Sequence, residues 1–237
     1  MKYTTVLFDA DGTLLDFGRS EREAVAEAFS NIGVETDGEM LDEYSRINDR
    51  MWKKLELKEI DKDTLMYRRF ELFFEKYGIT ADAHRMADEY LKTLSHKGYI
   101  LDGADELCKR LRGKTKMYIV TNGVKATQEK RLSLCGLLDC FDGVFISECV
   151  GIEKPQKEFF EYVASRIEGF DKERTVIVGD SLSSDIKGGV NFGIDTCWYN
   201  PSEKTAPENI AGSITYVAKS YDEIYQILTK GDTNLEK

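Results

Sequence analysis

The stretch VLFDADGTLL at residues 6–15 carries two carboxylates, Asp9 and Asp11, directly after a run of apolar residues. Residues 3–8 are β-branched, aromatic or aliphatic throughout, which predicts a strand buried on both faces of a parallel sheet. Gly12 then breaks the strand. Because open α/β sheets bind ligands at the carboxyl ends of their strands, we expect both acids at a binding crevice. A strand followed by a plain Asp-Gly turn is the alternative interpretation of this stretch alone.

A second apolar run, MYIVTNG at residues 117–123, ends in Thr121 and Asn122 before a helix-like segment. Hydroxyl and backbone N–H donors at such a strand-to-helix junction suit the oxygens of a phosphate group. The same residue types also cap helices and form turns, so this run alone does not decide between the two interpretations.

Two later segments continue the series. In GIEKP, residues 151–155, a proline restricts the backbone of Lys154 and begins a helix, and a lysine fixed in this way could neutralise a phosphate and a carboxylate together. In the run at residues 175–185, Asp180 follows a strand and Asp185 falls in the first turn of the next helix. Both acids could face one hard cation, since Mg²⁺ prefers oxygen ligands. Asp185 could equally be a favourable acid near a helix N-terminus.

These four segments, in this order, resemble the four motifs of the haloacid dehalogenase-like (HAD) hydrolase superfamily. The resemblance implies that Asp9 is a nucleophile that attacks phosphorus and forms an aspartyl-phosphate. It also implies that Asp11 is the general acid/base, which protonates the leaving oxygen and later activates water. Superfamily members that cleave carbon–halogen bonds lack an acid two residues after the nucleophile and need no magnesium. Asp11 therefore favours phosphoryl transfer over dehalogenation.

The resemblance also implies which residues bind phosphate and metal. Thr121 and Asn122 are expected to bind the phosphate group, and Lys154 is expected to hold the phosphate and the nucleophile together. The expected cofactor is Mg²⁺. Its expected ligands are Asp9, the backbone carbonyl of Asp11, and Asp180, with Asp185 ordering the site from close by or through water.

From residue 20 to about residue 94 the apolar residues repeat with the 3.6-residue period of helices. The expected helices cover residues 20–32, 39–57, 61–77 and 81–94. This insert resembles the α-helical cap of the superfamily, a lid that excludes water and selects the leaving group. The expected division is a core domain of residues 1–17 and 97–230, a cap domain of residues 18–96, and a frayed tail of residues 231–237.

Strand-like and helix-like segments alternate in the rest of the chain. This alternation predicts an α/β fold with a doubly wound, Rossmann-like parallel sheet. The expected strands lie near residues 3–9, 116–121, 143–147, 174–179 and 195–199. The expected helices lie near residues 104–112, 124–136, 156–168, 183–192 and 221–229.

Within the insert, a helix would place Asn48 and Trp52 on one face, four residues apart. The pair could stack on a base and hydrogen-bond its edge, or the tryptophan could pack in the core of the cap beside a solvated amide. Arg68 and Arg69 could likewise contact a substrate or lie on a solvated face. The segments that resemble bacterial pyrimidine 5′-nucleotidases are the one with Asn48 and Trp52, the Arg69-Phe70 pair, residues 151–155 and residues 193–200.

This closer resemblance implies a 5′-nucleotidase whose substrate is a small phosphorylated metabolite, namely a pyrimidine nucleoside monophosphate. The enzymatic alternative is a sugar-phosphate phosphatase or a β-phosphoglucomutase-type phosphotransferase with the same core. The alternative of another class is a non-catalytic binding or regulatory protein that keeps the fold. Whether Asn48, Trp52 and Arg68 touch a substrate or only pack stays open at this point.

The net charge of −10 disfavours binding to nucleic acid polymers or to anionic membranes. No window of the sequence approaches the ~20 apolar residues of a membrane span. The five cysteines are odd in number and match no zinc spacing, and no signal peptide is visible, so a cytoplasmic location is expected. The expected assembly is a monomer or a small homo-oligomer.

Overall fold

The computed structural model describes residues 1–230 and forms two compact units. The first unit comprises Met1–Asp16, Ile100–Lys125 and the chain from Cys135 onward, and the second comprises Phe17–Tyr99 and Ala126–Leu134. Residues 126–134 group with the helical unit, whereas the predicted division assigns them to the core. The division at residues 17–18 and 96–97 remains a prediction, and the predicted tail at residues 231–237 lies outside the described residues.

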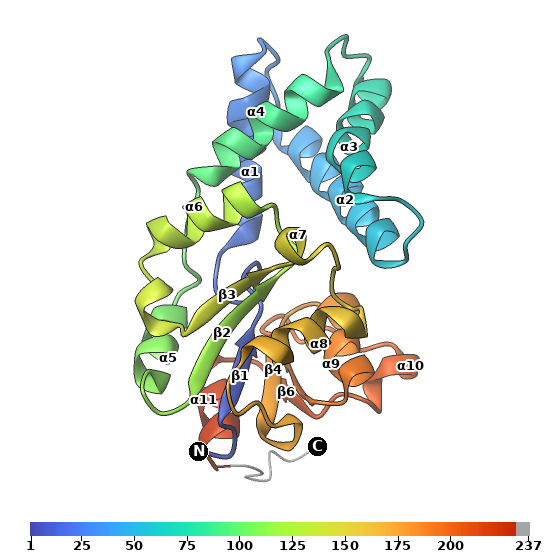
Figure 1. Ribbon diagram of the computed structural model, residues 1–237. Coiled ribbons are helices and arrows are strands. Elements are labelled where there is room, and N and C mark those ends of the chain that lie inside the picture. Colours follow the sequence, from blue (N-terminus) through green and yellow to red (C-terminus); the bar gives the residue numbers. More distant parts are fainter. Residues whose placement is uncertain (231–237) are drawn as a thin grey trace. The chain divides into compact units, whose positions relative to one another are not determined.

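Within the described chain, the first unit contains a parallel sheet of six strands in the order β3-β2-β1-β4-β5-β6 (Figure 1). The strands are β1 (Thr5–Phe8), β2 (Lys116–Thr121), β3 (Gly143–Ile146), β4 (Thr175–Gly179), β5 (Asp195–Tyr199) and β6 (Tyr216–Ala218). All of β1 is buried, as its uninterrupted apolar run predicts. The α/β class and the five predicted strands are confirmed. The sequence prediction missed β6, because three residues are too short to show a strand pattern.

Helices connect these strands in the way that a parallel sheet requires. They are α5 (Ala104–Leu111), α6 (Lys125–Cys135), α7 (Ser147–Val150), α8 (Lys157–Arg166), α9 (Lys187–Phe192) and α10 (Glu208–Ala211), with 3-10 turns at Leu138–Cys140 and Lys172–Arg174. Helix α11 (Tyr221–Lys230) follows the last of these strands. The predicted helix over residues 183–192 is divided, since a π-helical turn at Leu182–Ile186 precedes α9. Such turns occur frequently at functional sites.

Apolar side chains of α8 and α9 pack against the sheet. Phe159 and Phe160 of α8 belong to one buried cluster with Leu7 of β1 and Ile177 of β4. Helix α9 approaches the strands closely because Gly189 has no side chain: a Cβ there would lie 2.6 Å from the Cγ2 atom of Ile177. This packing supports the strands whose carboxyl ends carry the acidic motifs.

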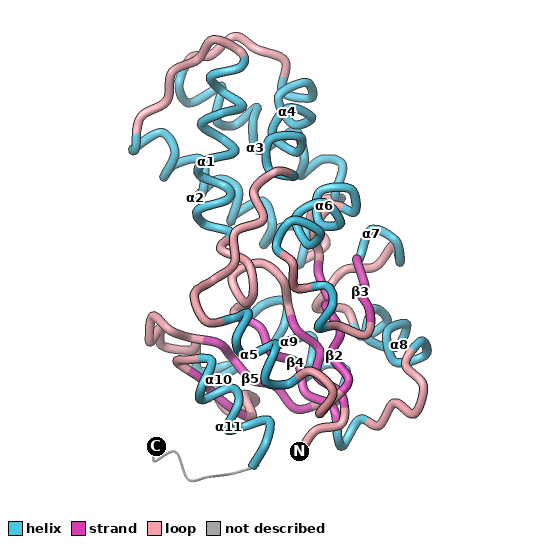
Figure 2. Tube along the Cα trace, turned by 90° about the vertical axis from the view of Figure 1, so that its left-hand side faces the viewer, coloured by secondary structure: helices cyan, strands magenta, loops and turns pink. Residues whose placement is uncertain are grey.

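The second unit is helical, and Figure 2 shows these residues in the colours of helices and loops. Besides most of α6, it contains α1 (Phe17–Asn31), α2 (Gly38–Glu56), α3 (Lys62–Tyr77) and α4 (Ala83–Ser95), and each of these four begins and ends within three residues of a predicted helix. Aspartates cap α2, α3 and α4, since the side chains of Asp37, Asp61 and Asp82 accept hydrogen bonds from backbone N–H groups of the first turn. Apolar side chains of all four helices form one buried cluster.

Among residues 1–230, no helix is both long enough and apolar enough to cross a lipid bilayer.

Candidate active site

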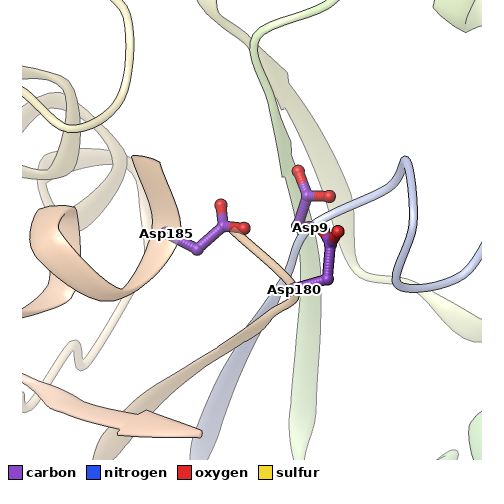
Figure 3. A group of neighbouring side chains, drawn as sticks. All are labelled: Asp9, Asp180 and Asp185. Atoms are coloured by element: carbon purple, nitrogen blue, oxygen red, sulfur yellow. The ribbon is translucent and has the colours of Figure 1, made fainter. Parts of the chain in front are cut away.

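Asp9 and Asp180 each follow a strand of the sheet directly, and these two strands are neighbours. Phe8 of β1 pairs with Val178 of β4, and the N–H group of Asp9 donates a hydrogen bond to the carbonyl of Val178 at 2.9 Å. This register brings the two acids to the same edge of the sheet, as their positions after buried apolar runs predict. Figure 3 shows the carboxylates of Asp9, Asp180 and Asp185 gathered there, and one oxygen of each lies within 4.8 Å of the other two.

Asp185 reaches this edge from the π-helical turn. Its N–H group donates to the carbonyl of Ser181 at 3.1 Å, and its Oδ2 atom accepts from the N–H group of Ser181, also at 3.1 Å. The side chain is completely buried beside Gly179. A Cβ atom at Gly179 would overlap the Asp185 carboxylate, so glycine is required for this close approach.

Lys154 joins two of the carboxylates. Its Nζ atom lies 2.6 Å from Oδ1 of Asp9 and 2.6 Å from Oδ1 of Asp185, and it also donates to the carbonyl of Val120 at 2.8 Å. The lysine side chain is only 1% exposed. All three donor positions of the ammonium group are therefore used inside the protein.

Asn122 fixes the backbone of Lys154 by a reciprocal pair of hydrogen bonds. The N–H group of Lys154 donates to Oδ1 of Asn122 at 2.9 Å, and Nδ2 of Asn122 donates to the carbonyl of Lys154, also at 2.9 Å. Sequence reasoning assigned Asn122 to phosphate binding and did not foresee this link. Thr121 ends β2 as a buried residue, and its Oγ1 atom accepts a hydrogen bond from the N–H group of Gly123 at 3.2 Å.

Burial and charge shift the ionisation of the central pair. Burial disfavours the charged form of Lys154, but the carboxylates of Asp185 and Asp9 outweigh it and raise the pKa of the lysine above its ordinary value. Burial also raises the pKa of Asp9 well above its usual range, with Asp185 and Asp180 acting in the same direction and Lys154 opposing them. When all four groups are ionised, one ammonium faces three carboxylates. A divalent cation would relieve the remaining negative charge.

The loop after β1 lies against Asp180. Gly12 has a φ of +81°, and a Cβ atom there would be 2.6 Å from Oδ2 of Asp180. The hydroxyl of Thr13 donates to Oδ1 of Asp180 at 3.4 Å. Asp11 is half-buried in this loop. A donor set of carboxylate and backbone oxygens suits a hard cation such as Mg²⁺, and Asp9, Asp180 and Asp185 form the group that could hold one.

Asn48 of α2 lies inside the second unit and is completely buried. Its Nδ2 atom donates to Oε1 of Glu21 at 2.7 Å, and its Oδ1 atom accepts from Nη1 of Arg69 at 2.9 Å. The other oxygen of Glu21 accepts from the hydroxyl of Ser45 at 2.5 Å. Sequence reasoning missed this buried network, because a local pattern gives no signal for polar side chains that meet across three helices.

Trp52 and Arg68 of the second unit are more accessible to solvent than Asn48. Trp52 is half-buried and packs against the apolar cluster of the second unit. Arg68 pairs with Glu71 at 2.7 Å and with Glu75 at 3.1 Å on the same helix. The roles of Asn48, Trp52 and Arg68 in substrate selection remain predictions.

Comparison with known proteins adds a second line of evidence. A family model described as haloacid dehalogenase-like hydrolase matches residues 3–193. The HAD-hydrolase YfnB of Bacillus subtilis is 40% identical over 98% of each chain. The pyrimidine 5′-nucleotidase PynA of Streptococcus pneumoniae is 39% identical over 97% of each chain, and the pyrimidine 5′-nucleotidase YjjG of Escherichia coli is 34% identical over 97% of this chain and all of its own.

A crystal structure of the Bacillus subtilis protein extends the comparison to three dimensions. It superposes with a TM-score of 0.92 at 39% identity and covers 97% of this chain and 100% of its own. That crystal form is bound to magnesium and reveals interdomain movement in that protein.

Proposed function

The chain belongs to the haloacid dehalogenase-like hydrolase family, and from this membership we propose that it is a magnesium-dependent phosphomonoesterase acting through an aspartyl-phosphate. The proposed substrates are pyrimidine nucleoside 5′-monophosphates. The observation that carries the proposal is the position of Asp9, which meets Lys154 and the other two carboxylates at the carboxyl edge of the sheet.

In this proposal Asp9 is the nucleophile. One of its carboxylate oxygens forms a bond to phosphorus while the bond between phosphorus and the ester oxygen breaks, and Asp11 gives that ester oxygen a proton. Asp11 then takes a proton from the water that hydrolyses the aspartyl-phosphate, so that phosphate and free Asp9 are restored. Lys154 keeps the Asp9 carboxylate oriented, because its bonds to Asp185 and Val120 fix the ammonium group.

Asp9, Asp180 and the backbone carbonyl of Asp11 would hold the magnesium ion, which when bound supplies positive charge for the phosphoryl oxygens. The contacts of Asp185 favour a positioning role, since its two oxygens already bind Lys154 and the N–H group of Ser181. Magnesium bound to the related Bacillus subtilis protein supports this choice of ion. We propose that Thr121 and Asn122, which lie at the carboxyl end of β2, bind the phosphate group.

The substrate class rests on the relatives and on the helical unit. Two relatives that match nearly the whole chain are named as pyrimidine 5′-nucleotidases. We propose that Trp52 offers its ring to the base and that Arg68 contributes charge near the substrate. Asn48 would act through its bonds to Glu21 and Arg69, because its side chain is completely buried.

A panel of phosphate esters tests this function. Release of inorganic phosphate would be measured with Mg²⁺ for pyrimidine and purine nucleoside monophosphates, for sugar phosphates and for p-nitrophenyl phosphate. We expect the highest kcat/KM for pyrimidine nucleotides and no turnover after chelation of the metal. A preference for sugar phosphates would identify a sugar-phosphate phosphatase, and isomerised sugar phosphate with little free phosphate would identify a mutase.

The matched variants for this panel are Asp9→Asn and Asp139→Asn. The first removes the proposed nucleophile with little change of volume, and the second changes an exposed carboxylate in the first unit. If the parent protein left every ester intact in the presence of Mg²⁺, a non-catalytic binding or regulatory role would replace the proposal.

A further inference from the structure

Two aromatic side chains donate hydrogen bonds to backbone carbonyls of the two loops that carry the acids. Nε1 of Trp198 donates to the carbonyl of Asp180 at 2.9 Å. The hydroxyl of Tyr221 donates to the carbonyl of Thr13 at 3.0 Å. Neither aromatic residue belongs to the four superfamily motifs, although Trp198 lies in residues 193–200, one of the segments that resemble the pyrimidine 5′-nucleotidases.

The fold fixes both donors firmly. Trp198 pairs with Gly179 in the β4–β5 register, so its ring stands beside the end of the strand from which Asp180 follows, and the residue is 4% exposed. Tyr221 stacks on Tyr199, with ring centroids 4.9 Å apart and an interplanar angle of 24°. Because Tyr199 follows Trp198 in β5, one strand supports both donors.

The two loops that these donors hold also contact each other. The hydroxyl of Thr13 donates a hydrogen bond to Oδ1 of Asp180. The Asp180 carboxylate also lies so close to Gly12 that a Cβ atom at position 12 would overlap it. Asp9 and Asp11 lie on one of these loops and Asp180 lies on the other. The distance between them therefore depends on how each loop is anchored. These are the proposed metal ligands, so the anchors act on the geometry of the metal site.

We propose that Trp198 and Tyr221 are positioning residues that set the affinity of the site for its divalent cation. This inference rests on the proposed function, because the cation is the one that the phosphatase would use. Hydrogen bonds that orient metal ligands in proteins typically change metal affinity or activity about 10–100-fold when they are removed.

The test uses variants that keep the ring and remove only the donor. Trp198→Phe loses the indole N–H, and Tyr221→Phe loses the hydroxyl while the stack on Tyr199 remains. Binding of Mn²⁺ alone to the substrate-free protein would be measured by electron paramagnetic resonance. Tyr225→Phe is the matched control, because its hydroxyl lies on the same helix but accepts a hydrogen bond from Lys114 at 3.1 Å.

We expect each of the two variants to weaken Mn²⁺ binding about tenfold. We also expect the Mg²⁺ concentration for half-maximal activity to rise by a similar factor while kcat at saturating Mg²⁺ changes little. Tyr225→Phe should bind Mn²⁺ as the parent does. Unchanged Mn²⁺ affinity in folded Tyr221→Phe protein would overturn the inference, whatever the stability of Trp198→Phe.

A further variant separates this inference from the proposed function. Asp180→Asn removes a proposed ligand itself and should abolish Mn²⁺ binding at this site. If Asp180→Asn bound Mn²⁺ as tightly as the parent, the proposed metal site would fail, and the inference would fail with it. If only the aromatic variants kept parental affinity, the metal site would stand and the positioning role alone would be wrong.

Discussion

The ammonium group of Lys154 lies 2.6 Å from the carboxylate of Asp9, although 145 positions of sequence separate the two residues. Both side chains are buried, and Lys154 makes an equally short contact with Asp185. A buried ion pair of this kind is costly to break, because the remaining charge has no water to solvate it. The same ion pair therefore stabilises the first unit and orients Asp9, the proposed nucleophile.

Replacement of Lys154 by methionine should abolish turnover and strongly destabilise the protein. The buried carboxylates of Asp9 and Asp185 would lose their ammonium partner, and a loss of about 3–5 kcal/mol in the free energy of unfolding is expected. Urea denaturation without added metal measures this loss. The control is Lys157→Met, since Lys157 is exposed and water screens its pairing with Glu161. Equal stabilities for the two variants would contradict the account.

Two glycines with the same φ allow backbone strain to be separated from crowding at the site. Gly12 and Gly33 both have φ of +81°, but a Cβ at Gly33 would meet nothing within 4 Å, whereas one at Gly12 would meet the Asp180 carboxylate. Both alanine variants should lose about 1–2 kcal/mol of stability from the left-handed backbone. Only in Gly12→Ala should kcat/KM also fall, by about a hundredfold, because the added methyl group would displace the Asp180 carboxylate from its position in the site. Steady-state kinetics of both alanine variants at saturating Mg²⁺ would measure this difference. Full activity in Gly12→Ala would show that activity does not depend on the close approach of Gly12 to the Asp180 carboxylate.

Glu21 should make stability depend on pH. Burial raises the pKa of this carboxyl to about 7, against the hydrogen bonds from Ser45 and Asn48 and the charge of Arg69. At pH values between the ordinary pKa of 4.5 and about 7, Glu21 keeps its proton in the folded protein, whereas the unfolded chain has released it. The contribution of Glu21 to the free energy of unfolding is therefore complete at low pH and is lost as the pH rises through that window.

The variant Glu21→Gln stays neutral and should lack this loss. Between pH 4.5 and pH 8 the variant should therefore gain about 3 kcal/mol in the free energy of unfolding relative to the parent. Because the difference is taken, other titrating groups cancel. Glu35→Gln, a change at an exposed position, serves as control. A difference that stays constant with pH would show that Glu21 does not hold a proton in the folded state.

Replacement of Trp52 by alanine should raise KM about tenfold for nucleotides and much less for p-nitrophenyl phosphate, if the ring stacks on a base. Trp52→Phe keeps an aromatic plane and should retain most of the nucleotide affinity. Equal increases for both kinds of substrate would instead favour a purely packing role within the apolar cluster.

The sequence predicted those parts of the molecule that local patterns determine. Buried apolar runs identified the strands that Asp9 and Asp180 follow and the strand that ends at Thr121, and the parallel topology then brings these strand ends to one edge. The helices of the insert followed from their periodicity. Three further features depend on side chains that meet across distant segments, which no local pattern specifies. They are the link between Asn122 and Lys154, the buried network around Glu21, and the anchors at Trp198 and Tyr221. The π-helical turn that carries Asp185 is local, but its sequence predicts the start of an ordinary helix.

Asn48 illustrates this limit. Its spacing from Trp52 predicted a shared helical face, and both residues do lie on α2. The spacing could not show that Glu21 and Arg69 occupy both ends of the Asn48 amide. Long-range pairing of polar groups therefore decides which residues of a helical face remain accessible to a ligand.

The proposed mechanism requires that the Asp9 carboxylate becomes phosphorylated during turnover. Borohydride quenching of the protein during turnover of a pyrimidine nucleotide with Mg²⁺ would reduce an acyl phosphate at this position to homoserine, which peptide mass spectrometry identifies. We predict homoserine at position 9, dependent on both substrate and metal and absent from Asp9→Asn, which should be inactive. Full turnover with position 9 unmodified, or parental activity in Asp9→Asn, would show that Asp9 is not the nucleophile.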